Sequence, residues 1–230
     1  MMSDSWHTYP SIFALGHRAL EELFLDPILV EEKVDGSQFS FGFFPEHPKG
    51  WRVRSKGADI SPYAPEKMFA PAVETIRSLP LINGWTYRAE YLSKPKHNTL
   101  AYDRIPLHGL ILFDINVGHE EYLVWDEKAA EAARLGLEVV PRLFEGVFPD
   151  LTQLQTWLNT TMNTMSVLGK QTIEGLVFKN YTRFGPDKKV LMGKFVSEAF
   201  KETHKGEWRR MNPNSGDILD RLWVEYRTPA

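Results

Sequence analysis

The sequence contains eight short segments with the composition of β-strands, and most of them follow one another without a helix between them. Each is rich in apolar, aromatic or β-branched residues and is bounded by Gly, Pro, Asn or Asp. They cover residues 27–33, 37–44, 51–55, 85–92, 107–117, 121–125, 173–181 and 189–196. Strands in adjacent runs favour antiparallel sheets over the strand–helix alternation of a doubly wound parallel sheet, so we expect an α+β fold.

Fewer segments have helical character. The expected helices cover residues 66–79, 126–136, 150–169, 197–211 and 215–228, and a short amphipathic helix begins at Gly16. Pro71 is expected to kink or break the first of them, and Asp126 and Gly136 are the expected N-cap and C-cap of the second. Because residues 212–216 read as a linker, we divide the chain into a main domain, 1–210, and a C-terminal linker and helix, 211–230.

Composition excludes several classes of protein. The 230 residues are 43% hydrophobic, which predicts a globular chain with one main domain. Cysteine is absent, which excludes disulfides and thiolate metal sites and permits a reducing compartment. The N-terminus lacks a basic-then-apolar signal pattern, and no apolar run approaches the ~20 residues that cross a bilayer. We therefore expect a cytoplasmic protein without a membrane partner.

The charge balance argues against a protein that coats long stretches of nucleic acid, because the net charge is −3. Basic residues nevertheless gather between Arg183 and Arg210, where eight Lys or Arg stand against four Asp or Glu. This stretch could contact a few phosphates. The alternative is that it is only the solvated side of a C-terminal helix.

Lys33 ends an apolar strand and is followed by Val-Asp-Gly. Desolvating an ammonium costs several kcal/mol unless the charge is paired or the proton is lost, so this lysine either reaches water or is used. Gly36 permits positive φ and lets backbone pass close to a ligand. A lysine nucleophile attacks as the neutral amine, which burial or neighbouring cations favour.

Five further motifs follow this lysine in a fixed order. They are RVRSKG (52–57), YRAEYL (87–92), LILFDI (110–115), IEGLVFKNY (173–181) and LMGKFVSEAFKE (191–202). With KVDG, the series resembles the collinear motifs of the covalent nucleotidyltransferases, the superfamily of ATP-dependent DNA and RNA ligases and mRNA capping enzymes. The short distance from Glu174 to Lys194 looks most like the bacteriophage-type RNA ligases that seal RNA ends, including nicks. The resemblance implies the ATP-grasp-like nucleotidyltransferase fold of ligase adenylation domains, with antiparallel sheets flanked by helices.

The resemblance also implies a reaction in three steps. Lys33 would attack the α-phosphorus of ATP to form a lysyl-adenylate, AMP would pass to an RNA 5′-phosphate, and a 3′-hydroxyl would then displace AMP. Lys194 would contact the α-phosphate, and Glu174 would help to hold Mg²⁺ or Mn²⁺, which prefer oxygen ligands. The alternative for Glu174 is an exposed strand end. The implied partner is nicked or paired RNA, with DNA as the second substrate, and a monomer is favoured.

The remaining nucleotide contacts leave alternatives open. Glu90 would hydrogen-bond the ribose. Phe113 would stack on adenine, although an aromatic residue in a strand usually belongs to the core. Arg54 and Lys56 both match the cation of the second motif, and the sequence does not choose between them.

Strand register decides the choice between Glu31 and Glu32, because neighbouring side chains point to opposite faces. The one on the nucleotide side would accept a hydrogen bond from the adenine amino group. Lys179 is a second phosphate candidate, with a solvated strand end as the alternative.

Two residues depart from the pattern of the RNA ligases. Met192 stands where a second lysine is common, so Lys188 or Lys189 could replace the lost cation. Gln38 stands where asparagine is common.

Three alternatives to an RNA ligase stay open: a DNA ligase adenylation domain, a capping enzyme, and a nucleotide-binding or nucleic-acid-binding relative without activity. Ligases of this type usually carry a further C-terminal domain. The chain is therefore expected to be either a minimal or truncated adenylyltransferase domain or a compact ligase that uses its own basic stretch. Trp208, Trp223 and Tyr226 could stack on bases, with helix packing as the alternative.

Overall fold

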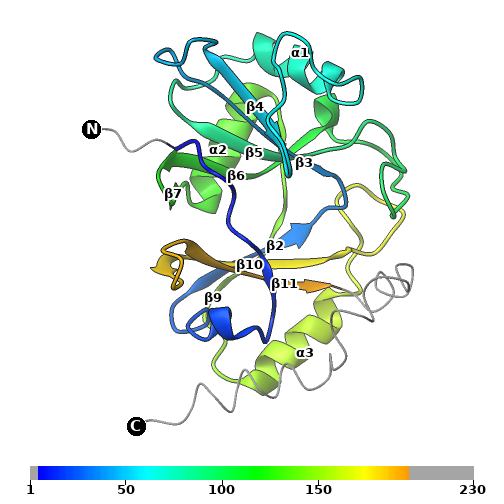
Figure 1. Ribbon diagram of the computed structural model, residues 1–230. Helices are drawn as coiled ribbons and strands as arrows, with labels where there is room; N and C mark the ends of the chain where they lie inside the picture. The colour runs from blue at the N-terminus through cyan, green and yellow to red at the C-terminus, as the bar shows by residue number, and fades with distance from the viewer. Residues whose placement is uncertain (1–4, 197–230) are drawn as a thin grey trace. The chain divides into compact units, whose positions relative to one another are not determined.

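The structure is a computed structural model that describes residues 5–196 (Figure 1). The described chain divides into two compact units. Unit 1 contains residues 5–9, Asp35–Val140 and Val167–Gln171, and unit 2 contains Pro10–Val34, Pro141–Ser166 and residues 172–196. The expected helices at 197–211 and 215–228, the linker at 212–216 and the three aromatic residues near the C-terminus lie outside the described residues.

Unit 1 is built on a mainly antiparallel sheet with the strand order β4-β3-β5-β6-β7, and β8 pairs with β6 in parallel. The strands are β3 (Ser37–Phe43), β4 (Trp51–Ser55), β5 (Thr86–Tyr91), β6 (Leu110–Gly118), β7 (Glu121–Tyr122) and β8 (Glu138–Val139). The helices are α1 (Ala70–Ser78), α2 (Trp125–Leu135) and the 3₁₀ turn η2 (Leu107–Gly109).

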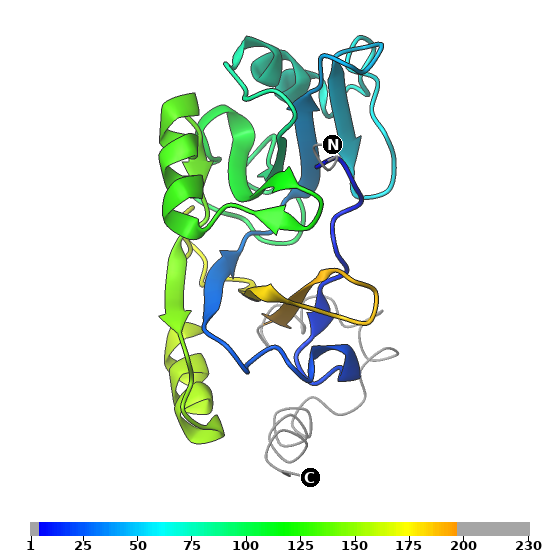
Figure 2. The ribbon, with the colours of Figure 1, turned by 90° about the vertical axis from the view of Figure 1, so that its left-hand side faces the viewer.

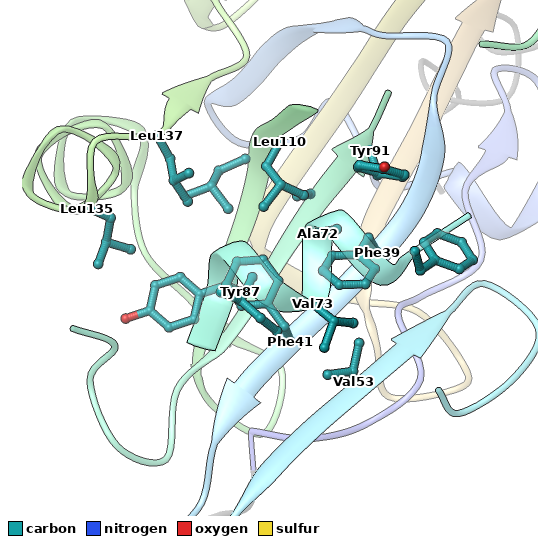
Figure 3. Packing of buried hydrophobic residues seen from close by; sticks show 14 of the residues in the cluster. Phe39, Phe41, Val53, Ala72, Val73, Tyr87, Tyr91, Leu110, Leu135 and Leu137 are labelled. Atoms are coloured by element: carbon teal, nitrogen blue, oxygen red, sulfur yellow. The ribbon is translucent and has the colours of Figure 1, made fainter. Parts of the chain in front are cut away.

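One face of this sheet carries the aromatic core of unit 1 (Figure 3). Alternate side chains of β3 and β5 point to that face, and the rings of Phe41 and Tyr87 stack at 5.4 Å. Ala72 and Val73 of α1 belong to the same cluster, as do Ala132 and Leu135 of α2. Both helices therefore bury their apolar faces against one side of the sheet, and the other side keeps the polar residues.

Unit 2 is built on a sheet with the strand order β1-β11-β10-β2-β9. Its strands are β1 (Phe13–Ala14), β2 (Ile28–Lys33), β9 (Arg142–Gly146), β10 (Gly175–Phe184) and β11 (Val190–Val196). Helix α3 (Leu151–Thr161) and the 3₁₀ turn η1 (Arg18–Leu20) complete the unit (Figures 1 and 2). Leu154 and Leu158 of α3 pack in one cluster with Val30, Leu176 and Phe178. One face of this sheet is therefore apolar and covered.

The α+β class with antiparallel sheets is confirmed. Several local predictions are wrong. Pro71 lies in the first turn of α1, where its missing N–H interrupts no helical hydrogen bond, so it starts the helix instead of kinking it. Helix α2 begins at Trp125 with Val124 as the N-cap, and Asp126 lies in its first turn. Gly136 is confirmed as the C-cap, with a φ of 68°.

Other differences concern short elements. Helix α3 has the expected start, where Asp150 accepts a hydrogen bond from the Gln153 N–H at 2.8 Å, but it ends at Thr161 and not at Gly169. The helix expected from Gly16 is only η1. Three strands were not predicted, namely β1, β8 and β9, because each is short and becomes a strand through pairing with a distant segment.

Candidate active site

In unit 2, four of the expected site residues share the face of the sheet opposite the apolar core. Lys33 and Glu31 alternate along β2, and their Cα partners on β10 are Gly175 and Val177. Lys179 lies two residues further along β10, and Lys194 of β11 is the partner of Val177. Because antiparallel partners point to the same side, the register brings Glu31, Lys33, Lys179 and Lys194 onto one face.

Lys33 and Glu174 form an ion pair in which Nζ and Oε1 are 2.6 Å apart. The Glu174 side chain is 3% exposed and that of Lys33 is 27% exposed. The exposed strand end considered for Glu174 is therefore wrong. Gly175 allows this arrangement, because a Cβ there would lie 2.2 Å from the Phe195 carbonyl oxygen. Strands β10 and β11 approach too closely at this point for any side chain.

A second ion pair lies on the same face. Lys179 Nζ and Glu31 Oε2 are 2.6 Å apart, and both side chains are 1% exposed. Lys179 is therefore buried, and the solvated position considered for it is wrong. Glu32 points to the other face, where its Oε1 accepts a hydrogen bond from the Ser166 hydroxyl at 2.5 Å. The register thus separates the two glutamates, and Glu31 is the one beside Lys33.

Met192 and the nearby lysines occupy different parts of the β10–β11 pair. Met192 is the Cα partner of Lys179 and is 1% exposed. Lys188 and Lys189 lie in the turn between the two strands, at the end of β10 away from Glu174 and Lys33. Lys188 is exposed and has a positive φ of 60°.

In unit 1, the polar face of the sheet carries two of the expected site residues, Glu90 and Arg54. Glu90 on β5 is the Cα partner of Gln38 on β3, and Arg54 on β4 is the partner of Ser40. All four side chains belong to the face opposite the aromatic core. Gly36 lies against Glu90, because a Cβ on this glycine would be 3.0 Å from the Glu90 Cβ.

Arg54 and Lys56 differ in their surroundings. Arg54 belongs to β4 and donates from Nη1 to the Thr8 hydroxyl at 3.1 Å, and its Nε lies 4.0 Å from Asp59. Lys56 follows the strand and is exposed. The sheet therefore presents Arg54, while Lys56 lies in a loop.

Phe113 is the extra residue of a bulge in β6, because Leu112 and Asp114 pair with the consecutive residues Ala89 and Arg88. It is half-buried and does not belong to the aromatic core cluster. Its ring meets Tyr9 edge to face, with the centroids 5.2 Å apart. The core position considered for Phe113 is therefore wrong.

The sequence reasoning missed a buried polar network around Arg88, which is fully buried on the polar face of unit 1. Its guanidinium donates to Asn116 Oδ1, Ser40 Oγ and the His7 carbonyl at 2.8–3.1 Å. Burial lowers the pKa of Arg88, and burial with the nearby Asp114 charge raises the pKa of Tyr122. The sequence did contain a signal for this network, because Arg88 lies in the middle of the strand predicted at 85–92.

A second missed feature holds the turn after Lys33. The Asp35 Oδ2 accepts hydrogen bonds from the backbone N–H groups of Thr99 and Leu100, both at 2.8 Å, and the Asp35 N–H donates to the Tyr102 hydroxyl. Strands β2 and β3 belong to different sheets, so the KVDG segment is a crossing between sheets and not a hairpin.

Two negative observations concern residues 5–196. Within them, no three His, Cys, Asp or Glu side chains come together as a ready-made metal cage. None of the helices in this part of the chain is long and apolar enough to cross a membrane.

The chain is similar to a known protein family and to solved structures. A family model described as RNA ligase matches residues 26–196. A search of curated proteins finds no match. A structure of the Naegleria gruberi RNA ligase with PPi is similar, with a TM-score of 0.61 and 19% identity over 87% of this chain and 58% of that one.

Two structures of variants of the same ligase are also similar. One, with ATP and Mn, has a TM-score of 0.59, and the other, with AMP and Mn, has 0.60; each is 19% identical over 87% of this chain and 59% of its own. At this identity the likeness shows the fold. The chain spans less than two thirds of the length of these solved ligases.

Proposed function

Since the chain belongs to the RNA ligase family, we propose that it is an ATP-dependent RNA ligase whose residues 1–210 form the adenylyltransferase domain and whose Lys33 becomes adenylylated. The observation that carries the proposal is the face of the unit 2 sheet on which Lys33, Glu31, Lys179 and Lys194 lie together, with Glu174 at 2.6 Å from the Lys33 ammonium. A buried carboxylate at this distance orients the partly exposed lysine and accepts a hydrogen bond from it.

In the first step, the Lys33 ammonium gives a proton to water, its neutral nitrogen attacks the α-phosphorus of ATP, and the nitrogen releases a second proton as the lysyl-adenylate forms. The P–N bond forms as the bond to the β-phosphate oxygen breaks, and pyrophosphate leaves. The protein contributes alignment and charge neutralisation, which dominate phosphoryl transfer. Lys194 shares the face of Lys33 and would contact the α-phosphate, with Lys179 as the second cation on that face.

The polar face of the unit 1 sheet would bind the nucleoside. Glu90 offers a carboxylate to the ribose hydroxyls, Phe113 offers a half-buried ring to adenine, and Arg54 offers a cation to phosphate or ribose. Lys56, exposed in the loop, is the second candidate for that cation. Of the two alternatives, Glu31 and Glu32, the candidate for the adenine amino group is Glu31, since it is the one on the Lys33 face.

A divalent cation, Mg²⁺ or Mn²⁺, fits the donor set of unit 2. Glu174 supplies one buried carboxylate, and Mg²⁺ is commonly held by one or two carboxylates together with waters and substrate phosphates. Such an ion would neutralise charge on the phosphates during transfer.

The later steps concern RNA. AMP would pass from Lys33 to an RNA 5′-phosphate, and an RNA 3′-hydroxyl would then displace it, on nicked or paired ends. DNA is the competing substrate, and a monomeric, cytoplasmic protein remains our expectation. Residues 211–230 would form the C-terminal linker and helix.

Intact mass spectrometry of the denatured protein tests the first step. Protein shown to carry no AMP is incubated with magnesium and ATP, GTP or NAD, as wild type, Lys33→Ala and Lys67→Ala, the last being an exposed lysine before α1. We expect an AMP-sized adduct with ATP alone, in wild type and Lys67→Ala but not in Lys33→Ala. An adduct that survives in Lys33→Ala refutes the nucleophile, and no adduct in wild type indicates a binding relative without step one.

Sealing assays then separate the substrates. Nicked duplexes with a pre-adenylylated 5′-phosphate are offered with RNA or DNA on either side of the nick. Sealing that requires RNA at the nick supports the RNA ligase, and equal sealing of all-DNA nicks would favour a DNA ligase domain.

A further inference from the structure

The chain segment before the matched family region contacts residues of the proposed nucleotide site. The family match begins at residue 26. Residues 7–9 contribute to unit 1 and residues 10–15 to unit 2. We call residues 7–15 the N-terminal strap.

In unit 1, the strap holds Arg54 through Thr8. The Thr8 hydroxyl accepts a hydrogen bond from Arg54 Nη1 at 3.1 Å. Arg54 has a long side chain with many rotamers, and fixing such a chain before a ligand arrives reduces the entropy lost on binding.

The strap also holds Phe113 through Tyr9. The Tyr9 ring lies edge to face against Phe113, at 5.2 Å and 73°. Tyr9 is itself fixed from two sides, because its hydroxyl donates to Asp114 Oδ2 and the Arg88 guanidinium lies 5.6 Å from its ring centroid. The His7 carbonyl accepts from Arg88 Nη2 at 2.8 Å. The buried network around Arg88 therefore supports the ring that contacts Phe113.

In unit 2, the strap runs beside the strand that carries Lys194. Strand β1 pairs in parallel with β11, with Ala14 opposite Lys194, and the Leu15 N–H donates to the Lys194 carbonyl at 2.9 Å. Gly193 makes room for this contact, because a Cβ there would lie 2.8 Å from Leu15 Cδ2. The backbone of the proposed phosphate-binding lysine is thus fixed by the strap.

We propose that the N-terminal strap is part of the ATP site, with Tyr9 and Thr8 as positioning residues that set the orientation of Phe113 and Arg54 and hence the affinity for ATP. This inference rests on the proposed function. A site that is rigid before binding binds more tightly, because less order is lost when the ligand arrives.

Four full-length variants test it. Tyr9→Leu removes the ring beside Phe113, Tyr9→Phe keeps the ring and removes the hydroxyl, and Thr8→Val removes the acceptor for Arg54. Ser5→Ala is the matched control, because Ser5 is a buried residue before the strap whose hydroxyl donates to the Gly84 carbonyl at 2.7 Å and contacts Thr86 at 2.8 Å. The readouts are KM for ATP and kcat in self-adenylation, together with Tm.

We expect Tyr9→Leu to raise KM for ATP about three- to tenfold, the range of an aromatic pair contact. Thr8→Val should raise it by a similar factor, about that of one ordinary hydrogen bond. In both variants kcat should stay within about twofold of wild type, an expectation for residues that act on binding alone. Tyr9→Phe keeps the ring and loses one of its two supports, so its KM should lie between those of wild type and Tyr9→Leu. Ser5→Ala should lower Tm without changing KM.

Two outcomes separate the inference from its premise. A wild type that forms no AMP adduct defeats the proposed function before the strap is tested. If wild type is adenylylated and the KM values of Tyr9→Leu and Thr8→Val stay within twofold of the Ser5→Ala value while Tm falls, the strap only stabilises the fold and the inference is wrong.

Discussion

The buried Glu31–Lys179 pair gives the sharpest prediction about stability. Its two charged atoms are 2.6 Å apart and both side chains are 1% exposed. Lys179→Met removes the ammonium and keeps most of the side-chain volume. At an effective dielectric constant of about 20, two unit charges at 2.6 Å attract by about 6 kcal/mol. Desolvation of the two ions costs several kcal/mol each, so the intact pair contributes little net stability.

Removing one partner is different, because the carboxylate keeps its desolvation cost and loses the attraction. Lys179→Met should therefore lower the free energy of unfolding by about 3–5 kcal/mol. That is a large fraction of the ~5–15 kcal/mol by which native proteins are stable. Glu31→Gln combined with Lys179→Met removes both charges and should recover more than half of the loss, since neither group then carries a buried charge.

Urea denaturation at pH 7, followed by circular dichroism, measures wild type, both single variants and the double variant. Lys67→Met is the control for the loss of an exposed lysine and should change the free energy of unfolding by less than about 0.5 kcal/mol. The reasoning is refuted if Lys179→Met costs less than about 1 kcal/mol, or if the double variant is as unstable as the sum of the two single variants, because the charges would then not be coupled.

Two further predictions concern unit 1 and the β10–β11 pair. Burial lowers the pKa of His97 below its ordinary value of 6.5. As the pH falls through 6.5, the unfolded chain therefore takes up a proton on His97 before the folded chain does. The contribution of neutral His97 to stability is complete above that pH and declines as the pH falls toward the pKa in the folded protein. Tm should therefore fall more steeply between about pH 7 and 5 in wild type than in His97→Gln, and equal slopes would contradict the assignment. Gly175→Ala should cost about 1–3 kcal/mol in urea denaturation, because the new Cβ would lie 2.2 Å from a backbone oxygen. Gly57→Ala, where a Cβ meets nothing within 4 Å, is its control; equal losses would refute the clash.

The sequence predicts those strands whose ends are marked by neighbouring turn residues. Strand β2 ends where Lys33 meets Val-Asp-Gly, and β5 lies between Gly84 and Ser93, so composition and punctuation were enough. Strand β9 was missed because its residues, Arg-Leu-Phe-Glu-Gly, do not look like a strand alone and become one by pairing with β2 more than a hundred residues earlier. Trp125 was assigned to a strand because Tyr122–Trp125 is a continuous apolar and aromatic run. Its indole nevertheless donates to the Val140 carbonyl, and it begins α2.

The candidate site shows the same division. Residue types and their order pointed to Lys33, Glu90, Phe113, Glu174 and Lys194, and their roles remain a proposal. The choice of Glu31 over Glu32 needed the structure only to show that β2 runs as a regular strand to Lys33, because alternation then puts Glu31 and Lys33 on one face. The contact of Tyr9 with Phe113 joins residues 104 positions apart in the chain, and no local pattern announces it.

Strand register also indicates which lysine lies nearest to Met192, the position where a second lysine is common in related ligases. Lys188 and Lys189 were the sequence candidates. Both lie in the turn before β11, and Lys189 precedes Met192 by three residues, about 10 Å at 3.3 Å per residue. Neither is the cross-strand partner of Met192. Lys179, the direct partner of Met192, already places an ammonium there. A lysine at 192 would put a second buried cation beside the Lys179 ammonium, and methionine avoids that cost. The proposed phosphate contact therefore depends chiefly on Lys194, since the Lys179 ammonium is buried against Glu31.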